Sequence, residues 1–198
     1  MVLYKERRRF KGFSESIGRT FSKLGLSPNQ WTLLTIIFAL LTLYFLIKSD
    51  FLIAAIFLII TAFIDLVDGS VARFLGKTSN FGAYLDTIVD RYVEAIIIFG
   101  LLFATLPNVF IPIYAWIFLY LFGAMMTTYA KSSAKEKELV SKEIKGGFLE
   151  RAERMLILFI GLLLAFFDAF YLSAIIVILA VLTNISALQR IYIAIKRV

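Results

Sequence analysis

The segment FIDLVDGSVARFLGKTSNFGAYLDTIVDRYVEA, Phe63–Ala95, carries four aspartates at the facing ends of two long apolar runs. The chain around it has 198 residues, of which 61% are hydrophobic. A carboxylate in hydrocarbon is costly, and ionisable residues inside a membrane are rare and usually functional. This segment therefore decides both how the chain folds and where its chemistry is to be sought.

Apolar runs close to membrane-spanning length continue on both sides of the segment. About 20 residues in a helix cross a hydrocarbon core ~30 Å thick. Six runs have this character: 31–47, 51–75, 81–106, 110–129, 155–167 and 171–195. The fifth is short, and its helix is expected to begin earlier, near Leu149. The sequence predicts an all-α, polytopic membrane protein with six transmembrane helices.

Basic residues gather on one side of the predicted bundle. All of the 21 Lys and Arg residues except Lys48 and Arg91 lie in the amino-terminal segment, the second loop, the fourth loop or the carboxy-terminal end. The positive-inside rule then places both termini on the cytoplasmic side of the cell membrane. The net charge of +7 suits contact with anionic membrane lipids. Nucleic acid is not an expected partner, because these charges flank membrane spans.

The amino-terminal segment, 1–30, is expected to be a cytoplasmic juxtamembrane segment ahead of a catalytic domain over 31–198. Its basic and aromatic residues alternate at roughly helical spacing, which favours an amphipathic helix on the membrane interface. The alternative is a positive flank that only sets topology. No cleavable signal peptide is expected, because the segment has no apolar core. Ser27 and Pro28 are suited to cap and begin the next helix.

The residue types that are missing narrow the chemistry. The chain has no Cys and no His, which excludes disulfides, thiol chemistry, a Ser-His-Asp triad and histidine-ligated zinc. Catalysis would have to use carboxylates, Lys, Arg, Tyr and hydroxyl groups.

The spacing of the aspartates places them in pairs on two helix faces. Asp65 and Asp68 are three residues apart, and Asp86 and Asp90 are four apart, so each pair shares a face. Antiparallel helices would bring the pairs to similar depth in the cytoplasmic half of the membrane. The alternative is a polar network that only holds helices together.

Divalent cations are the natural counterions for such a group. Neighbouring carboxylates cannot all stay ionised without compensation, and Mg²⁺ and Mn²⁺ prefer hard oxygen ligands. A metal so held could neutralise charge during phosphoryl transfer. The small residues Gly69, Ala72 and Gly82 leave these helix faces bare for a ligand, and Arg73 could pair with phosphate oxygens.

These residues resemble the signature of the CDP-alcohol phosphotransferase family. The motif here is Asp65-x2-Asp68-Gly69-x2-Ala72-Arg73-x8-Gly82-x3-Asp86-x3-Asp90, and all eight of its fixed positions match. The six-span pattern and Pro28-Asn29-x2-Thr32 extend the resemblance over the chain.

The resemblance implies transfer from a CDP-linked lipid donor to the hydroxyl of a small alcohol, with release of CMP. It implies one or two Mg²⁺ or Mn²⁺ ions on Asp65, Asp68 and Asp86, with Asp90 as the base and a further ligand. The nucleotide site implied is Asn29, Thr32, Asp65, Gly69, Ala72, Arg73 and Gly82. Similar enzymes are homodimers.

The stretch GGFLERAERMLIL, Gly146–Leu158, resembles the branch that accepts inositol phosphate, including archaetidylinositol-phosphate and phosphatidylinositol-phosphate synthases. That branch implies an acceptor phosphate bound by basic residues. The candidates are Lys135, Arg151, Arg154 and Arg190, with Lys131 a weaker one. An anionic acceptor requires such a cluster. The alternative is that these charges serve only to set the membrane topology.

Other functions fit parts of the pattern. Glycerol 3-phosphate is also anionic, so a glycerophosphate-accepting synthase remains an alternative, as does a di-inositol-phosphate synthase of the same family. From another class, a cation-coupled transporter could use intramembrane acids as an ion path. Against it, the last three predicted spans have no matching acidic set.

Overall fold

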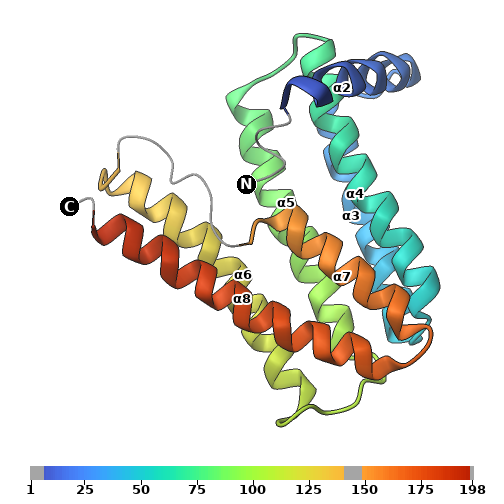
Figure 1. The fold of residues 1–198 in the computed structure, drawn as a ribbon. Helices are drawn as coiled ribbons and strands as arrows, with labels where there is room; N and C mark the ends of the chain where they lie inside the picture. The colour runs from blue at the N-terminus through green and yellow to red at the C-terminus, as the bar shows by residue number, and fades with distance from the viewer. Residues whose placement is uncertain (1–6, 141–148, 197–198) are drawn as a thin grey trace.

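The computed structural model describes residues 7–140 and 149–196, and its regular elements are helices (Figure 1). In chain order they are α2 (Arg7–Phe21), the 3-10 helix η1 (Ser22–Leu24), α3 (Pro28–Ile47), α4 (Phe51–Phe74), α5 (Asn80–Leu101), α6 (Ile113–Glu136), α7 (Arg151–Ala165) and α8 (Ala169–Ile195). The first six residues of the predicted juxtamembrane segment, and 141–148 of the predicted fourth loop, lie outside the described residues.

The predicted runs correspond to α3 through α8, with shifted ends. The fifth helix begins at Arg151, before the apolar run, as its short length suggested. The fourth continues past its apolar part to Glu136, so this helix extends into the predicted fourth loop. The third ends at Leu101, before the predicted limit of 106.

Polar side chains define where several helices begin. Ser27 caps α3, as predicted: the Gln30 amide donates to Ser27 Oγ over 3.3 Å, and the Ser27 amide donates to Gln30 Oε1 over 2.8 Å. Ser79 caps α5 by accepting the Gly82 amide at 3.0 Å. These caps fix the ends of the helices that face the site described below.

The helices form two groups that α7 joins. In the first group α3 packs against both α4 and α5, and α2 lies across the end of α4 (Figure 1). In the second group α6 packs along α8. Helix α7 contacts α4 on one side and α8 on the other. Its first turn is therefore placed where it can reach the acidic ends of α4 and α5.

Glycines allow the closest helix contacts. A Cβ atom on Gly123 of α6 would lie 2.5 Å from Thr183 Oγ1 and 2.8 Å from the Asn184 backbone nitrogen of α8. A Cβ atom on Gly100 of α5 would lie 2.9 Å from Leu46 Cδ1 of α3. Larger residues at these positions would force the helix pairs apart.

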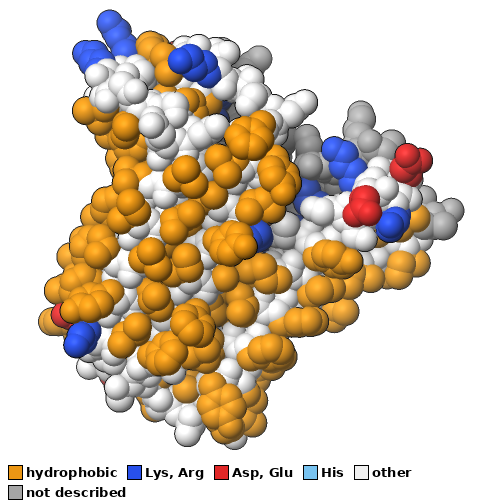
Figure 2. All heavy atoms as spheres, turned by 180° about the vertical axis from the view of Figure 1, so that it is seen from behind, with side chains coloured by type: hydrophobic (Ala, Val, Ile, Leu, Met, Phe, Trp, Pro, Cys, Tyr) orange, Lys and Arg blue, Asp and Glu red, His pale blue; other side chains and the backbone are white. Residues whose placement is uncertain are grey.

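The outer surface is apolar over the length of the bundle. Figure 2 shows hydrophobic side chains along the helices, with Lys and Arg side chains over α2 and charged side chains of both signs at the end of the α6–α8 pair. On α3 alone, Leu33, Ile37, Leu40, Tyr44 and Ile47 are all exposed. Surface of this extent and kind matches hydrocarbon better than water.

Four helices of the described residues are long and apolar enough to cross a membrane: α3, α4, α6 and α8. The fold is thus all-α and that of a multi-pass membrane protein. Helix α5 falls short because Asp86, Asp90, Arg91 and Glu94 interrupt its apolar sequence, and α7 has only 15 residues. Both of these helices line the site described below, together with α4.

We expect Gly123→Ala to destabilise the protein, because the added methyl group would meet α8 at sub-van der Waals distance. Overpacking of this kind costs about 1–3 kcal/mol. The measurement is the thermal unfolding midpoint of the purified protein in detergent. Gly12→Ala in α2 is the matched control, since no atom lies within 4 Å of a Cβ atom there. Equal midpoints for the two variants would contradict the prediction.

Candidate active site

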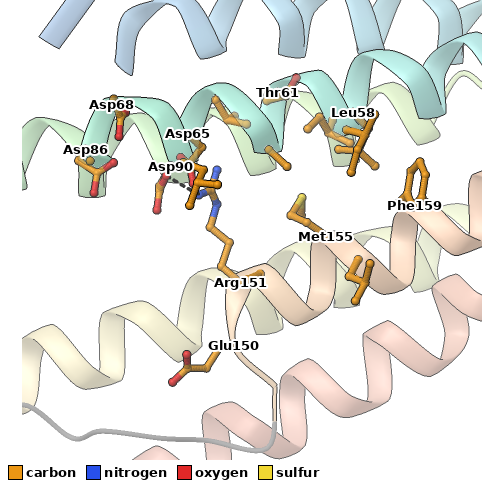
Figure 3. Close-up of a pocket in the computed structure, with 18 of the residues that line it drawn as sticks. Leu58, Thr61, Asp65, Asp68, Asp86, Asp90, Glu150, Arg151, Met155 and Phe159 are labelled. Carbon is orange, nitrogen blue, oxygen red and sulfur yellow. Dashed lines mark hydrogen bonds and ion pairs between the residues drawn. The ribbon is translucent and has the colours of Figure 1, made fainter. Parts of the chain in front are cut away.

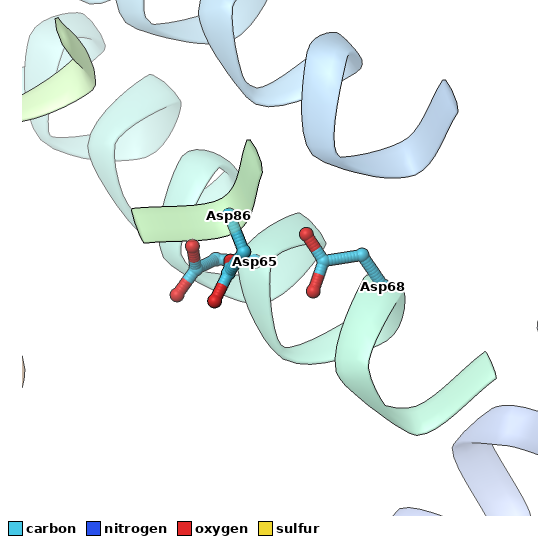
Figure 4. A group of neighbouring side chains, drawn as sticks. All are labelled: Asp65, Asp68 and Asp86. Atoms are coloured by element: carbon cyan, nitrogen blue, oxygen red, sulfur yellow. The ribbon is translucent and has the colours of Figure 1, made fainter. Parts of the chain in front are cut away.

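Three of the four motif aspartates converge between α4 and α5. Asp65, Asp68 and Asp86 each offer a carboxylate oxygen, and these oxygens lie within 4.8 Å of one another (Figure 4). Asp65 and Asp68 share a face of α4 as their spacing predicted. Helix α3 packs against both α4 and α5, so the facing acids are brought together by a helix that precedes both in the chain.

The donor set of this cluster suits a hard divalent cation. Asp68 is only 6% exposed, and its Oδ2 atom is buried without a hydrogen-bond partner among the described residues. A buried carboxylate oxygen without a hydrogen-bond donor is unfavourable unless it coordinates a cation. The three residues therefore fit Mg²⁺ or Mn²⁺, both of which take oxygen ligands.

Asp90 lies beside this cluster and shares an arginine with it. Arg151 Nη1 donates to both oxygens of Asp65 at 3.1 Å and forms an ion pair with Asp90 Oδ1 (Figure 3). The other oxygen of Asp90 lies 3.9 Å from Arg91 Nη2. Asp90 is not part of the group of three oxygens close enough for one ion. Its position next to the cluster suits a proton acceptor.

A cavity of about 660 Å³ opens beside these carboxylates, between α4, α5 and the start of α7. One end is polar, lined by Asp65, Asp68, Asp86, Asp90 and Arg151. The other end is apolar, and Figure 3 shows Leu58, Met155 and Phe159 there. A cavity with this division suits a ligand that has a charged head and a hydrocarbon tail.

A second, smaller cavity of about 150 Å³ lies between the starts of α3 and α5 and the end of α4. Its lining includes Asn29, Thr32, Gly69, Ala72, Arg73 and Gly82, which are all of the predicted nucleotide residues except Asp65. A Cβ atom on Gly82 would lie 3.2 Å from Ser79 Oγ and 3.5 Å from Asn29 Oδ1, so a side chain at this position would take up space at the cavity wall. Both cavities include Asp68, Gly69, Arg73 and Asp86 in their linings. They meet at the carboxylate cluster.

A buried ion pair lies behind the polar end of the large cavity. Arg154 is 2% exposed and donates twice to Glu94, from Nε at 2.7 Å and from Nη2 at 2.9 Å. Arg91 Nη1 donates to the same carboxylate at 2.8 Å and to Thr128 Oγ1 of α6 at 3.0 Å. One acid therefore joins α5, α6 and α7 through two arginines.

The four predicted acceptor residues occupy different places. Arg151 lines the large cavity, whereas Arg154 is engaged by Glu94. Arg190 is buried, and its Nη1 donates to the Thr127 carbonyl at 2.8 Å. Lys135 is exposed in the last turn of α6 and lines neither cavity. Residues 146–148 of the stretch that suggested the acceptor lie outside the described residues.

Sequence reasoning missed Glu94 as a partner of this cluster. It follows Gly82, Asp86 and Asp90 at the same interval of four, so it continues their helix face. A third acid in that series, with Arg91 three residues before it, was a usable signal for a buried ion pair. The partner on α7 could not be read from local spacing.

Comparisons with known proteins agree with this geometry. The family model described as CDP-alcohol phosphatidyltransferase matches residues 26–186. The chain is 36% identical over 197 residues to archaetidylinositol phosphate synthase of Pyrococcus horikoshii, covering 99% of this chain and 98% of that protein.

Solved structures of phosphatidylinositol phosphate synthase from Mycobacterium tuberculosis share the fold. The structure with CDP-DAG bound has a TM-score of 0.79 at 26% identity and covers 91% of this chain and 92% of that one. The complex with manganese and citrate has a TM-score of 0.81 at 26% identity, covering 91% and 88%. The chain belongs to the CDP-alcohol phosphatidyltransferase family, and it is a metal-dependent phosphotransferase of the membrane.

Proposed function

We propose that this protein transfers a phosphatidyl-type group from a CDP-linked lipid to the hydroxyl of inositol 1-phosphate and releases CMP. The observation that carries the proposal is the junction of the two cavities at the carboxylate cluster. A nucleotide in the small cavity and a lipid tail in the large one would place the phosphates of the donor at that junction. The similar enzymes from P. horikoshii and M. tuberculosis act in inositol phosphate lipid synthesis by name.

In this proposal Asp65, Asp68 and Asp86 hold Mg²⁺ or Mn²⁺. When bound, the metal would offset the negative charge of the donor phosphates. Asn29, Thr32, Gly69, Ala72, Arg73 and Gly82, together with Asp65, form the nucleotide site. Glycine and alanine there let the nucleotide approach the helix backbone, and Arg73 provides planar donors for phosphate oxygens.

Asp90 takes the proton of the acceptor hydroxyl in this mechanism. The hydroxyl oxygen forms the new bond to the lipid-linked phosphorus, and the anhydride bond to CMP breaks, so CMP leaves with the electron pair. Asp90 Oδ2 lies 3.9 Å from Arg91 Nη2, whereas Oδ1 is in direct contact with Arg151. The arginine orients the carboxylate and favours its ionised form before the proton is taken.

Arg151 also has the position expected for binding the acceptor phosphate, because it is the cavity-lining member of the predicted acceptor set. Arg154, Arg190 and the exposed Lys135 lie outside the cavity lining and would add positive charge around it. Their electrostatic field favours an acceptor that is itself an anion.

The proposal includes the full membrane arrangement. Helices α5 and α7 complete six spans: Asp86, Asp90 and Arg151 line the cavity, and Glu94 pairs with Arg154 inside the bundle. Helix α2 within the 1–30 segment lies on the cytoplasmic interface, and residues 31–198 form the catalytic domain. Both termini and the site face the cytoplasm, membrane lipids cover the outer apolar surface, and the protein is a homodimer.

An acceptor screen tests the reaction directly. Purified protein is given CDP-archaeol or CDP-diacylglycerol with Mg²⁺ and one of inositol 1-phosphate, inositol, glycerol 3-phosphate or serine. We expect CMP release to be fastest with inositol 1-phosphate, to stop on chelation and to return with added Mg²⁺ or Mn²⁺. Release only with glycerol 3-phosphate would refute the acceptor. Cation flux in vesicles without CMP release from any acceptor would refute the transferase.

We expect Asp90→Asn to abolish proton acceptance while keeping the size and shape of the side chain. The turnover number should fall by about 10²–10⁴-fold, the usual contribution of a general base. Donor binding, measured by titration with the CDP-linked lipid, should stay close to the wild-type value. Asp68→Asn is the comparison, since loss of a metal ligand should weaken donor binding itself. Equal loss of donor binding in both variants would assign Asp90 to the metal instead.

We expect Arg151→Gln to raise the apparent KM for inositol 1-phosphate more than that for the CDP-linked donor. A hydrogen bond to a charged group contributes about 1.5–3 kcal/mol, which corresponds to a tenfold or larger change. Lys137→Gln is the control, because Lys137 is an exposed cytoplasmic-side charge paired only with Glu136 in the described residues. If both variants left the two KM values unchanged, the basic residues would have no role beyond membrane topology.

A further inference from the structure

Helix α2 contacts an arginine of the smaller, nucleotide cavity through one hydroxyl group. Arg73 Nη2 donates to Ser14 Oγ of α2 over 2.8 Å, and a weaker contact joins the same nitrogen to Ser70 Oγ at 3.3 Å. The two serine oxygens are 2.9 Å apart. Ser14 is 59 residues away from Arg73 in the sequence, so this contact exists only because α2 packs across the end of α4.

The direction of each hydrogen bond in this group can be assigned. Ser70 Oγ donates its one proton to the Leu66 carbonyl at 2.7 Å. The bond between the serines must then run from Ser14 to Ser70, because a hydroxyl has a single proton to give. Ser14 therefore uses its proton on Ser70 and presents a lone pair to Arg73. The chain of donors runs from Arg73 through Ser14 and Ser70 to the backbone of α4.

Close packing of α2 against α4 determines where Ser14 lies. A Cβ atom on Gly18, one turn after Ser14, would lie 2.5 Å from the Ser70 carbonyl oxygen and 2.7 Å from Phe74 Cβ. Ile17 is buried in a small core with Trp31, Ile64, Val67 and Val71 of α3 and α4. The ring of Phe21 also packs edge-on against Trp31, with centroids 5.6 Å apart. These contacts hold the backbone of α2 against α4.

The guanidinium of Arg73 lies along α4 between the two cavities. It lines both of them, and a Cβ atom on Gly69 would lie 3.1 Å from Arg73 Nη1. The absence of a side chain on Gly69 lets Arg73 fold back over the preceding turn. The arginine is exposed apart from these contacts, and a free arginine side chain would lose much rotamer entropy on binding a phosphate.

We propose that Ser14 is a positioning residue for the CDP-binding site: its hydroxyl oxygen holds the guanidinium of Arg73 in place for the nucleotide phosphates. The inference rests on the proposed nucleotide role of Arg73. It makes α2 part of the substrate site, in addition to the interfacial position proposed for it above.

The test is a double-mutant cycle on CDP affinity, measured by calorimetric titration with CDP and Mg²⁺ on the full chain in detergent. We expect Ser14→Ala to weaken CDP binding roughly three- to tenfold, part of a charge-assisted hydrogen bond, because Ser70 remains. In an Arg73→Ala background the same change should have no further effect. Ser16→Ala, an exposed serine on the same helix, is the control and should bind CDP as the wild type does.

Two results would overturn the inference: wild-type CDP affinity in Ser14→Ala, or an equal weakening with and without Arg73. The second would mean that Ser14 acts through the packing of α2 and not through the arginine. Wild-type CMP release from CDP-archaeol and inositol 1-phosphate is measured alongside. If that release is absent while the CDP cycle behaves as expected, the proposed function fails and the role of Ser14 stands.

Discussion

The structure depends on one constraint: the negative charge of carboxylates that lie among apolar helices must be compensated. Asp65 and Asp90 come from different helices, and one guanidinium, that of Arg151, contacts both. Because a low dielectric strengthens attraction and repulsion alike, the acids of α4 and α5 can approach one another only with such a counterion or a metal nearby. The first turn of α7 is thereby tied to the two helices that carry the motif.

The same constraint acts deeper in the bundle. Glu94 is completely buried, and its charge is matched by Arg154 from α7 and Arg91 from its own helix. Removing either partner of such a pair would leave a buried charge uncompensated, which is far more costly than the pair is stabilising. The pair gives the wall behind the cavity a fixed arrangement. Arg151 can then serve the site while Arg154 serves the framework around it.

Much of the site could be predicted because its members are close in sequence. The faces formed by Asp65 with Asp68 and by Asp86 with Asp90 follow from helical periodicity, and the Ser27 cap follows from local hydrogen bonding. The contacts of Ser14 with Arg73 and of Glu94 with Arg154 could not be predicted in this way. Each joins helices that are far apart in the chain.

The sequence by itself determined the apolar helices and the spacing of the acids, since these depend on neighbours within one helix. It also determined the excess of basic residues in the segments predicted to lie on one side of the bundle. Only the tertiary structure decided which arginine meets which acid: Arg151 turns to the cavity and Arg154 to Glu94, although they are one turn apart. That choice depends on the rotation and depth of each helix. Close packing constrains both, at Gly100 where α5 meets α3 and at Gly161 where α7 meets α8.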